Sequence, residues 1–200
     1  MNGHPIHPLH PLMAHAAAEA ARIARGVRTE QLIGPTPCAD FDTRTLVDHW
    51  VLYTSHGLER RARRESLPEE LVTRDFTTDP GWAGAYADQL DRAVAAWSDP
   101  AVWEGEVDLG GMTMPAASVA QMVIKEMVLH GWDVAKATGQ QVVVEDDLAR
   151  LVLGVVEEHA ETYRRYGGFA APVPVPATAS FLDRALAASG RDPGWDRSTG

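Results

Sequence analysis

The chain has 200 residues, of which 45% are hydrophobic and 23% charged, and it carries a formal net charge of -10 at pH 7. This length suits one domain with a sizeable core, and the composition is that of an ordinary soluble globular protein. The acidic balance argues against a nucleic-acid partner, which would require a basic face.

Cysteine content and hydropathy limit the expected location of the protein. Cys38 is the single cysteine, which excludes an intramolecular disulfide and fits a reducing compartment. No apolar run approaches the roughly 20 residues of a membrane helix, and the N-terminus lacks the features of a signal peptide. We therefore expect a cytoplasmic protein with no membrane partner. The oligomeric state stays open, and a homodimer is one alternative.

The first residues alternate histidine with proline and predict an extension outside the fold. His4, His7 and His10 lie among prolines that cannot continue a helix, so residues 1–11 are expected to be flexible and to bind metal ions only adventitiously. Residues 12–200 are expected to form a single domain. Its first helix is predicted over residues 12–27, where alanine is frequent and apolar residues recur at helical spacing.

Capping residues and hydrophobic periodicity predict two further helices. One begins after Asp42, a good N-cap, and runs to about residue 65. Residues 66–78 lack clear periodicity and are expected to form a loop. The next helix is predicted to start with Asp79 as cap and Pro80 in the first helical position, and to end near residue 97.

The second half of the chain predicts a short hairpin and three more helices. Residues 102–109 and 112–114 flank Gly110-Gly111, which favours a turn between two strands. A long helix is expected from Pro115 to about residue 138, another from 145 to about 166, and a short one from 178 to 189 before a tail at 190–200. The expected fold is mainly all-α, a helical bundle with a minor β-hairpin and a short C-terminal helix.

Two of these helices carry polar side chains on apolar faces. Glu126 and His130 are four residues apart and interrupt a stripe of valines and methionines, so both can bind the same ion. His49 lies on the apolar face of the helix that follows Asp42. A lone histidine there is more often a hydrogen-bonded core residue. Together, His49, Glu126 and His130 would leave a coordination position of Zn²⁺ open, with Ni²⁺ or Fe²⁺ as alternatives.

Three segments of the chain resemble the DinB-like metal-binding superfamily, in the branch typified by the N-terminal domain of mycothiol-dependent maleylpyruvate isomerase. They are TPCADFD at 36–42 with LVDH at 46–49, EMVLHGWDVAKATG at 126–139, and the tail with PVP at 172–174, LDR at 182–184 and GRDP at 190–193. The resemblance implies a DinB-like four-helix bundle with a divalent metal, usually zinc, near one end. It implies the same ligands, His49, Glu126 and His130.

The resemblance also implies a chemistry. A low-molecular-weight thiol such as mycothiol or bacillithiol would be the co-substrate, and a small electrophilic molecule the acceptor, in a metal-dependent S-transferase or isomerase reaction.

Asp133 would hydrogen-bond an imidazole of the centre, although a surface cap or a pair with Lys136 is the alternative. Tyr53 and His56 are candidate general acids or bases, with simple packing as the alternative for both. Cys38 is expected to be structural.

A non-enzymatic role is the competing hypothesis. The bundle would then bind a metal ion that stabilises the fold, or bind a small molecule without transforming it. A purely structural zinc site is normally closed by four protein ligands, so a fourth ligand from His56 or Asp133 would favour this alternative.

Overall fold

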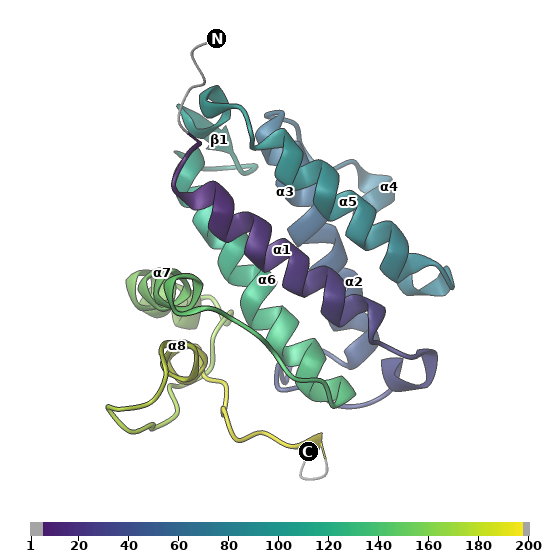
Figure 1. The fold of residues 1–200 in the computed structure, drawn as a ribbon, viewed down its shortest axis with the longest axis vertical. Coiled ribbons are helices and arrows are strands. Elements are labelled where there is room, and N and C mark those ends of the chain that lie inside the picture. The colour runs from purple at the N-terminus through teal and green to yellow at the C-terminus, as the bar shows by residue number, and fades with distance from the viewer. Residues whose placement is uncertain (1–5, 198–200) are drawn as a thin grey trace.

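A computed structural model of the chain describes residues 6–197. Figure 1 shows a bundle in which α1 (Leu9–Arg25), α5 (Trp82–Ala96) and α6 (Ala116–Thr138) run beside the segment formed by α2 (Thr43–Val51) and α3 (Gly57–Ala62). The helices α7 (Asp146–Arg165) and α8 (Phe181–Ala188) pack together on one side of this bundle. The prediction of a mainly α fold with a minor hairpin and a short C-terminal helix is confirmed.

The N-terminal helix starts earlier than the sequence predicts. α1 begins at Leu9 rather than at residue 12, because Pro11 falls in the first turn, where an amide hydrogen has no intrahelical partner in any case. His7 stacks on Trp103 with ring centroids 4.0 Å apart. α1 therefore includes residues 9–11 of the predicted extension, and His4 lies outside the described residues.

The second helix contains one wide turn that the sequence pattern does not reveal. Asp42 caps α2 by accepting a hydrogen bond from the Thr45 amide at 2.8 Å. A π-helical turn, η2 (Leu52–His56), then separates α2 from α3, and the helix ends at Ala62, short of the predicted residue 65. Thr54 and Ser55 donate hydroxyl hydrogen bonds to the carbonyls four residues earlier, both at 2.6 Å. Such a turn adds a residue and rotates everything after it relative to α2.

Short helical turns occupy segments predicted as loop or strand. They are η1 (Thr29–Leu32), α4 (Glu69–Val72), η3 (Phe76–Thr78) and η4 (Pro100–Trp103). Asp79 accepts a hydrogen bond from the Gly81 amide at 2.8 Å, so it closes a turn, and α5 begins only at Trp82. The hairpin pairs β1 (Glu106–Asp108) with β2 (Thr113–Pro115) in antiparallel register, and its first strand is shorter than predicted.

α6 is the central element and positions the site. Most of its residues are buried, and it ends at Gly139, whose φ of 70° is the left-handed conformation that favours glycine at this position. Residues 190–197, which were predicted to be part of a tail, pack against the bundle. This segment returns to α6, where Arg191 is buried and Arg197 donates a hydrogen bond to the Ala137 carbonyl at 3.1 Å.

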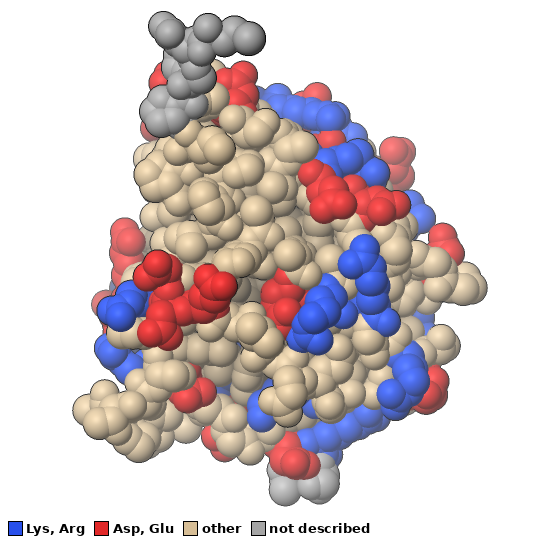
Figure 2. Space-filling model, viewed as in Figure 1, with Lys and Arg blue, Asp and Glu red and all other residues tan. Residues whose placement is uncertain are grey.

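The surface in Figure 2 mixes acidic and basic side chains over most of the face viewed. Its upper part shows no Lys, Arg, Asp or Glu where it lies over the first turns of α1, whose residues 9–18 contain none of these four types. Among the described residues, no helix combines the length and apolarity needed to cross a membrane.

Candidate metal centre

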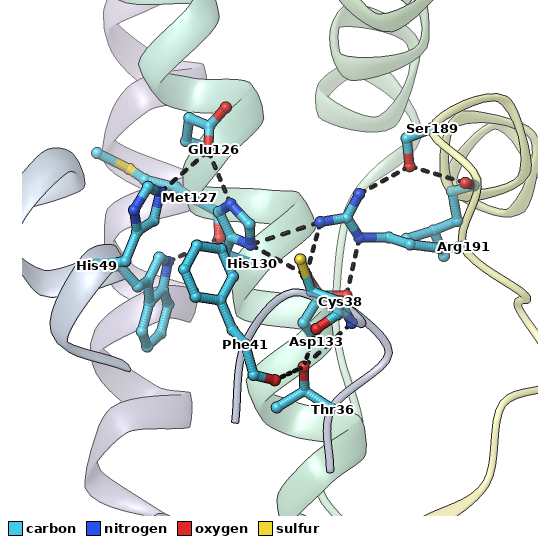
Figure 3. Close-up of polar contacts among 12 residues, drawn as sticks. Thr36, Cys38, Phe41, His49, Glu126, Met127, His130, Asp133, Ser189 and Arg191 are labelled. Atoms are coloured by element: carbon cyan, nitrogen blue, oxygen red, sulfur yellow. Dashed lines mark hydrogen bonds and ion pairs between the residues drawn. The ribbon is translucent and has the colours of Figure 1, made fainter. Parts of the chain in front are cut away.

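Three predicted side chains from two helices meet between α2 and α6. Glu126 and His130 project from successive turns of α6, with the Glu126 carboxylate 2.9 Å from His130 Nε2 and 4.0 Å from His49 Nε2 (Figure 3). The two imidazole rings lie with centroids 5.1 Å apart. One ligand atom from each of the three residues lies within 4.8 Å of the others.

A close contact between the two helices brings His49 to this position. Trp50, the next residue on α2, is fully buried and donates its indole hydrogen to the Met127 carbonyl of α6 at 3.3 Å. The indole also lies over Gly131, where a Cβ would come within 3.3 Å of it. A small residue one turn beyond Met127 therefore allows the helices to approach closely.

The donor set and its spacing suit a divalent cation. Zn²⁺ binds imidazole nitrogen and carboxylate oxygen at about 2.0–2.1 Å in a tetrahedron, which places donor atoms roughly 3.3 Å apart. The observed separations of 2.9 and 4.0 Å lie on either side of that value. Two nitrogens and one oxygen form an open set, because a three-ligand site leaves a position for water or substrate.

A buried lysine balances the charge of Glu126. Lys125 is 1% exposed, pairs with the second Glu126 oxygen, and lies over the rings of Tyr163 and Phe169, 4.2 and 5.4 Å from their centroids. Burial alone would raise the pKa of Glu126, but Lys125, His130 and His49 together hold it well below its ordinary value. Glu126 is thus an anion in the absence of any metal ion.

Sequence reasoning missed Lys125 because adjacent residues on a helix do not face each other. Its long side chain overcomes this limit by bending back toward its neighbour. The available signal was a lysine next to Glu126 in a run that is otherwise apolar from Met122 to Leu129.

A second buried ion pair fixes the far side of His130. The fully buried Asp133 carboxylate lies 3.0 Å from His130 Nδ1 and accepts two hydrogen bonds from Arg191, from Nε at 2.8 Å and Nη2 at 2.7 Å (Figure 3). Burial disfavours the charge of Asp133, but Arg191 and His130 keep its pKa below the ordinary value. Burial likewise opposes protonation of His130, yet Asp133 and Glu126 raise its pKa. Asp133 therefore contacts the imidazole, while Lys136 lies over the Trp132 ring instead of pairing with Asp133.

Cys38, His130 and Asp133 form a second group with metal-binding spacing. This group is the weaker candidate, because both Asp133 oxygens already bind Arg191. Burial and the Asp133 charge raise the pKa of Cys38 to about 11, so its sulfur stays a thiol at neutral pH. Those properties agree with a structural Cys38.

A cavity of about 210 Å³ opens beside the cluster. His49, Tyr53 and Glu126 line it together with Arg61 and the apolar side chains of Val119 and Met122. Tyr53 thus reaches the site, with its ring 4.7 Å from that of His49.

His56 does not reach the site. It stacks on Phe76 at 5.4 Å and lines a separate cavity that contains Arg74. Burial and Arg74 lower its pKa. The prediction that His56 shares the face of His49 is wrong because η2 lies between them and changes the helical phase.

The structure thus defines a class of protein, a helical bundle in which two histidines and a glutamate from facing helices converge beside a small cavity. The chain belongs to the family described as the mycothiol maleylpyruvate isomerase N-terminal domain, whose model matches residues 13–135. The matched range contains His49, Glu126, His130 and Asp133, and Arg191 lies beyond it.

Known proteins resemble the chain in sequence and in fold. Two Mycobacterium tuberculosis proteins, Uncharacterized protein MT0763 of strain CDC 1551 / Oshkosh and Uncharacterized protein Rv0738 of strain ATCC 25618 / H37Rv, are each 28% identical over 123 residues. The matched segment covers 62% of this chain and 63% of each relative.

Among solved structures, the crystal structure of the mycothiol-dependent maleylpyruvate isomerase superposes with a TM-score of 0.62 at 17% identity, over 97% of this chain and 83% of that one. A histidine-to-alanine mutant of the isomerase gives 0.61 at 16% identity with the same coverage. At these identities the likeness shows a shared fold.

Proposed function

We propose that the protein is a metal-dependent enzyme, a thiol S-transferase or isomerase that acts on a small electrophilic molecule with a low-molecular-weight thiol such as mycothiol. The observation that carries this proposal is the convergence of His49, Glu126 and His130 at the edge of a cavity. A closed structural zinc site would need a fourth ligand. The geometry supplies neither His56, which faces elsewhere, nor Asp133, whose oxygens bind Arg191.

The proposed ligands are His49, Glu126 and His130, and Zn²⁺ is the metal that this donor set fits best, with Ni²⁺ or Fe²⁺ as alternatives. A bound divalent cation with an open position would lower the pKa of a coordinating thiol or water and polarise an electrophile. The thiol is favoured over water because the family is described as the mycothiol maleylpyruvate isomerase N-terminal domain.

The protein's own residues prepare this site. Asp133 accepts the Nδ1 hydrogen of His130, which directs the Nε2 lone pair toward Glu126 and His49, and Arg191 holds Asp133 in place. Lys125 occupies one Glu126 oxygen and leaves the other facing the histidines. Tyr53 presents a phenol in the cavity wall, within reach of a ligand that also meets His49.

Metal analysis tests the centre directly. Tag-free protein is compared with the His49→Ala/His130→Ala variant and with a matched control, His10→Ala/His15→Ala, which removes two histidines from α1. We expect about one metal ion per chain in the wild type and the control, and none in the first variant. Equal metal content in all three proteins would overturn the centre.

Thiol consumption then separates an enzyme from a binding protein. Mycothiol and a panel of model electrophiles are incubated with metal-loaded protein, with and without chelator. We expect mycothiol consumption that chelator abolishes and that the His49→Ala/His130→Ala variant lacks. Metal binding without any such consumption would favour a non-catalytic metal-binding bundle.

A further inference from the structure

A second cavity lies between η2, η3 and α5, and it shares no lining residue with the cavity beside the metal centre. Its volume is about 180 Å³. His56 borders it from η2, and Arg74 and Phe76 border it from η3 and the residues just before. The helix α5 supplies Trp82 and Arg92. The proposed metal chemistry uses none of these side chains, so this cavity needs an explanation of its own.

Buried aromatic rings form the floor of the second cavity. Phe76, Trp82 and Tyr86 all line it and are 6, 8 and 1% exposed. The Tyr86 hydroxyl is paired with the hydroxyl of Thr54 at 2.7 Å, so Tyr86 offers the cavity its ring rather than a polar group. A flat apolar body, such as a single aromatic ring, can stack on this floor or meet it edge-on.

Two ring N–H groups beside this floor have no acceptor. Neither the imidazole of His56 nor the indole of Trp82 forms a hydrogen bond within residues 6–197, whereas the indoles of Trp50 and Trp97 each donate one. Both unpaired groups stay accessible to solvent, so an acceptor that enters the cavity can take a hydrogen bond from them. A largely buried N–H without an acceptor costs free energy that such a ligand would recover.

The charged side chains of the second cavity leave one positive charge in excess. Arg74 and Arg92 both border it, and neither forms an ion pair in the part of the chain that the structure describes. Asp79 is the single carboxylate among the lining residues. Burial and the nearby Arg74 lower the pKa of His56, which is therefore neutral at pH 7. Two cations and one anion suit a ligand with one negative charge.

We propose that this cavity is a second ligand site, which binds a small carboxylate with a planar apolar body, and this inference goes beyond the function proposed above. A guanidinium fork binds both oxygens of one carboxylate, and the apolar body lies on the aromatic floor. The volume of about 180 Å³ is below the roughly 300–1,000 Å³ of pockets for drug-sized ligands, which limits that body to about one ring. A phosphate ester carries a second negative charge, which Asp79 would repel.

Because no residue lines both cavities, the second one can be filled while a substrate occupies the first. Its occupant is therefore a ligand in addition to the substrate and the thiol. Neither His49 nor any other proposed metal ligand borders it, so its binding does not require a metal ion.

Imidazole NMR tests the inference on the protein as purified, with 4-fluorobenzoate, 4-fluorobenzamide and phenyl phosphate as probes. Isotope-labelled histidine gives one Cε1–H signal for each ring, and His56→Asn identifies the signal of His56. We expect 4-fluorobenzoate to shift this signal to saturation, with a Kd at least about tenfold lower than that of the neutral benzamide, as charge-assisted hydrogen bonds imply. Benzoate bound at the metal centre would instead move the signals of His49 and His130, so the two sites are tested separately.

The probes also give outcomes that contradict the proposal. A His56 signal that benzoate does not shift to saturation would refute the site. Equal Kd values for the benzoate and the benzamide would refute the role of charge. Tighter binding of phenyl phosphate than of benzoate would overturn the assignment to carboxylates in favour of phosphate esters.

Two double variants of equal net charge locate the effect. Arg74→Met/Arg92→Met is expected to weaken benzoate binding at least about tenfold and to leave benzamide binding within about twofold. Arg150→Met/Arg165→Met is the matched control on α7, because Arg150 lies over the Phe181 ring at 4.0 Å, as Arg74 lies over a ring at 5.2 Å. The control should bind benzoate as the wild type does. Equal benzoate binding in the two double variants would overturn the proposal, whatever metal analysis finds.

Discussion

The ion pair between Arg191 and Asp133 is predicted to be a major contributor to stability, and Arg191→Met tests this. The substitution keeps a long side chain but leaves the Asp133 carboxylate, which is 0% exposed, without its two hydrogen bonds of 2.8 and 2.7 Å. Removing one partner of a buried pair costs about 3–5 kcal/mol, because the other charge remains buried and uncompensated. His130 still contacts Asp133, so we expect a loss near the lower end, about 3 kcal/mol.

Urea unfolding of chelator-treated protein measures this loss without a contribution from bound metal. Arg184→Met is the matched control, since Arg184 forms an exposed pair with Glu157 at 3.6 Å and should contribute at most about 1 kcal/mol. The Asp133→Asn/Arg191→Met double variant should be more stable than the sum of the single changes implies, by about 2 kcal/mol. A loss in Arg191→Met no larger than in Arg184→Met would refute the reasoning.

Three further predictions concern α6 and α7. Lys125→Met should destabilise the chelator-treated protein by about 3 kcal/mol, because the Glu126 carboxylate loses its partner. The loss should be smaller in the zinc-loaded protein, where the zinc ion would balance the charge of Glu126. Melting temperatures with and without zinc check this. The pKa of His130 is raised in the folded state, so its stabilisation is present below about pH 6.5 and is lost as pH rises through the folded pKa. Chelator-treated wild type should therefore lose stability as the pH is raised above about 6.5, and His130→Gln should lose less. Gly154→Ala faces open space and should stabilise α7 by about 0.5–1 kcal/mol, whereas Gly131→Ala meets the Trp50 ring and should not stabilise the protein, as urea unfolding would show.

Local patterns were sufficient to predict most helices and the cluster of His49, Glu126 and His130. The spacing of Glu126 and His130 is a property of one helix, so the sequence shows it directly. Placing His49 opposite them needed only two apolar helix faces that pack together. The direction in which a later side chain points, however, depends on every helical turn before it. The π-helical turn η2 adds one residue to the helix, and nothing in the sequence pattern predicts it. His56 was misplaced for that reason.

The sequence did not predict side chains that distant segments of the chain bring to the site. Arg191 lies 58 residues after Asp133 in a segment that reads as a polar tail, and its burial depends on how α8 returns the chain to α6. Arg61 belongs to a basic run that is typical of a solvated helix end. Its place in the cavity wall follows from the wide turn η2 and from the space above Gly57.

The match to the family ends before the site is complete. Its model covers residues 13–135, and so includes Asp133 but not the arginine that neutralises it. Lys125 shows the same dependence, because the rings of Tyr163 and Phe169 that surround its ammonium group come from α7 and the segment after it. The Asp133 carboxylate therefore depends on Arg191 directly. The Glu126 carboxylate depends on Tyr163 and Phe169 through Lys125, so both carboxylates next to His130 need residues beyond position 135. It follows that a chain with the matched helices but a different C-terminal segment would need other partners for these two charges to keep the same arrangement around His130.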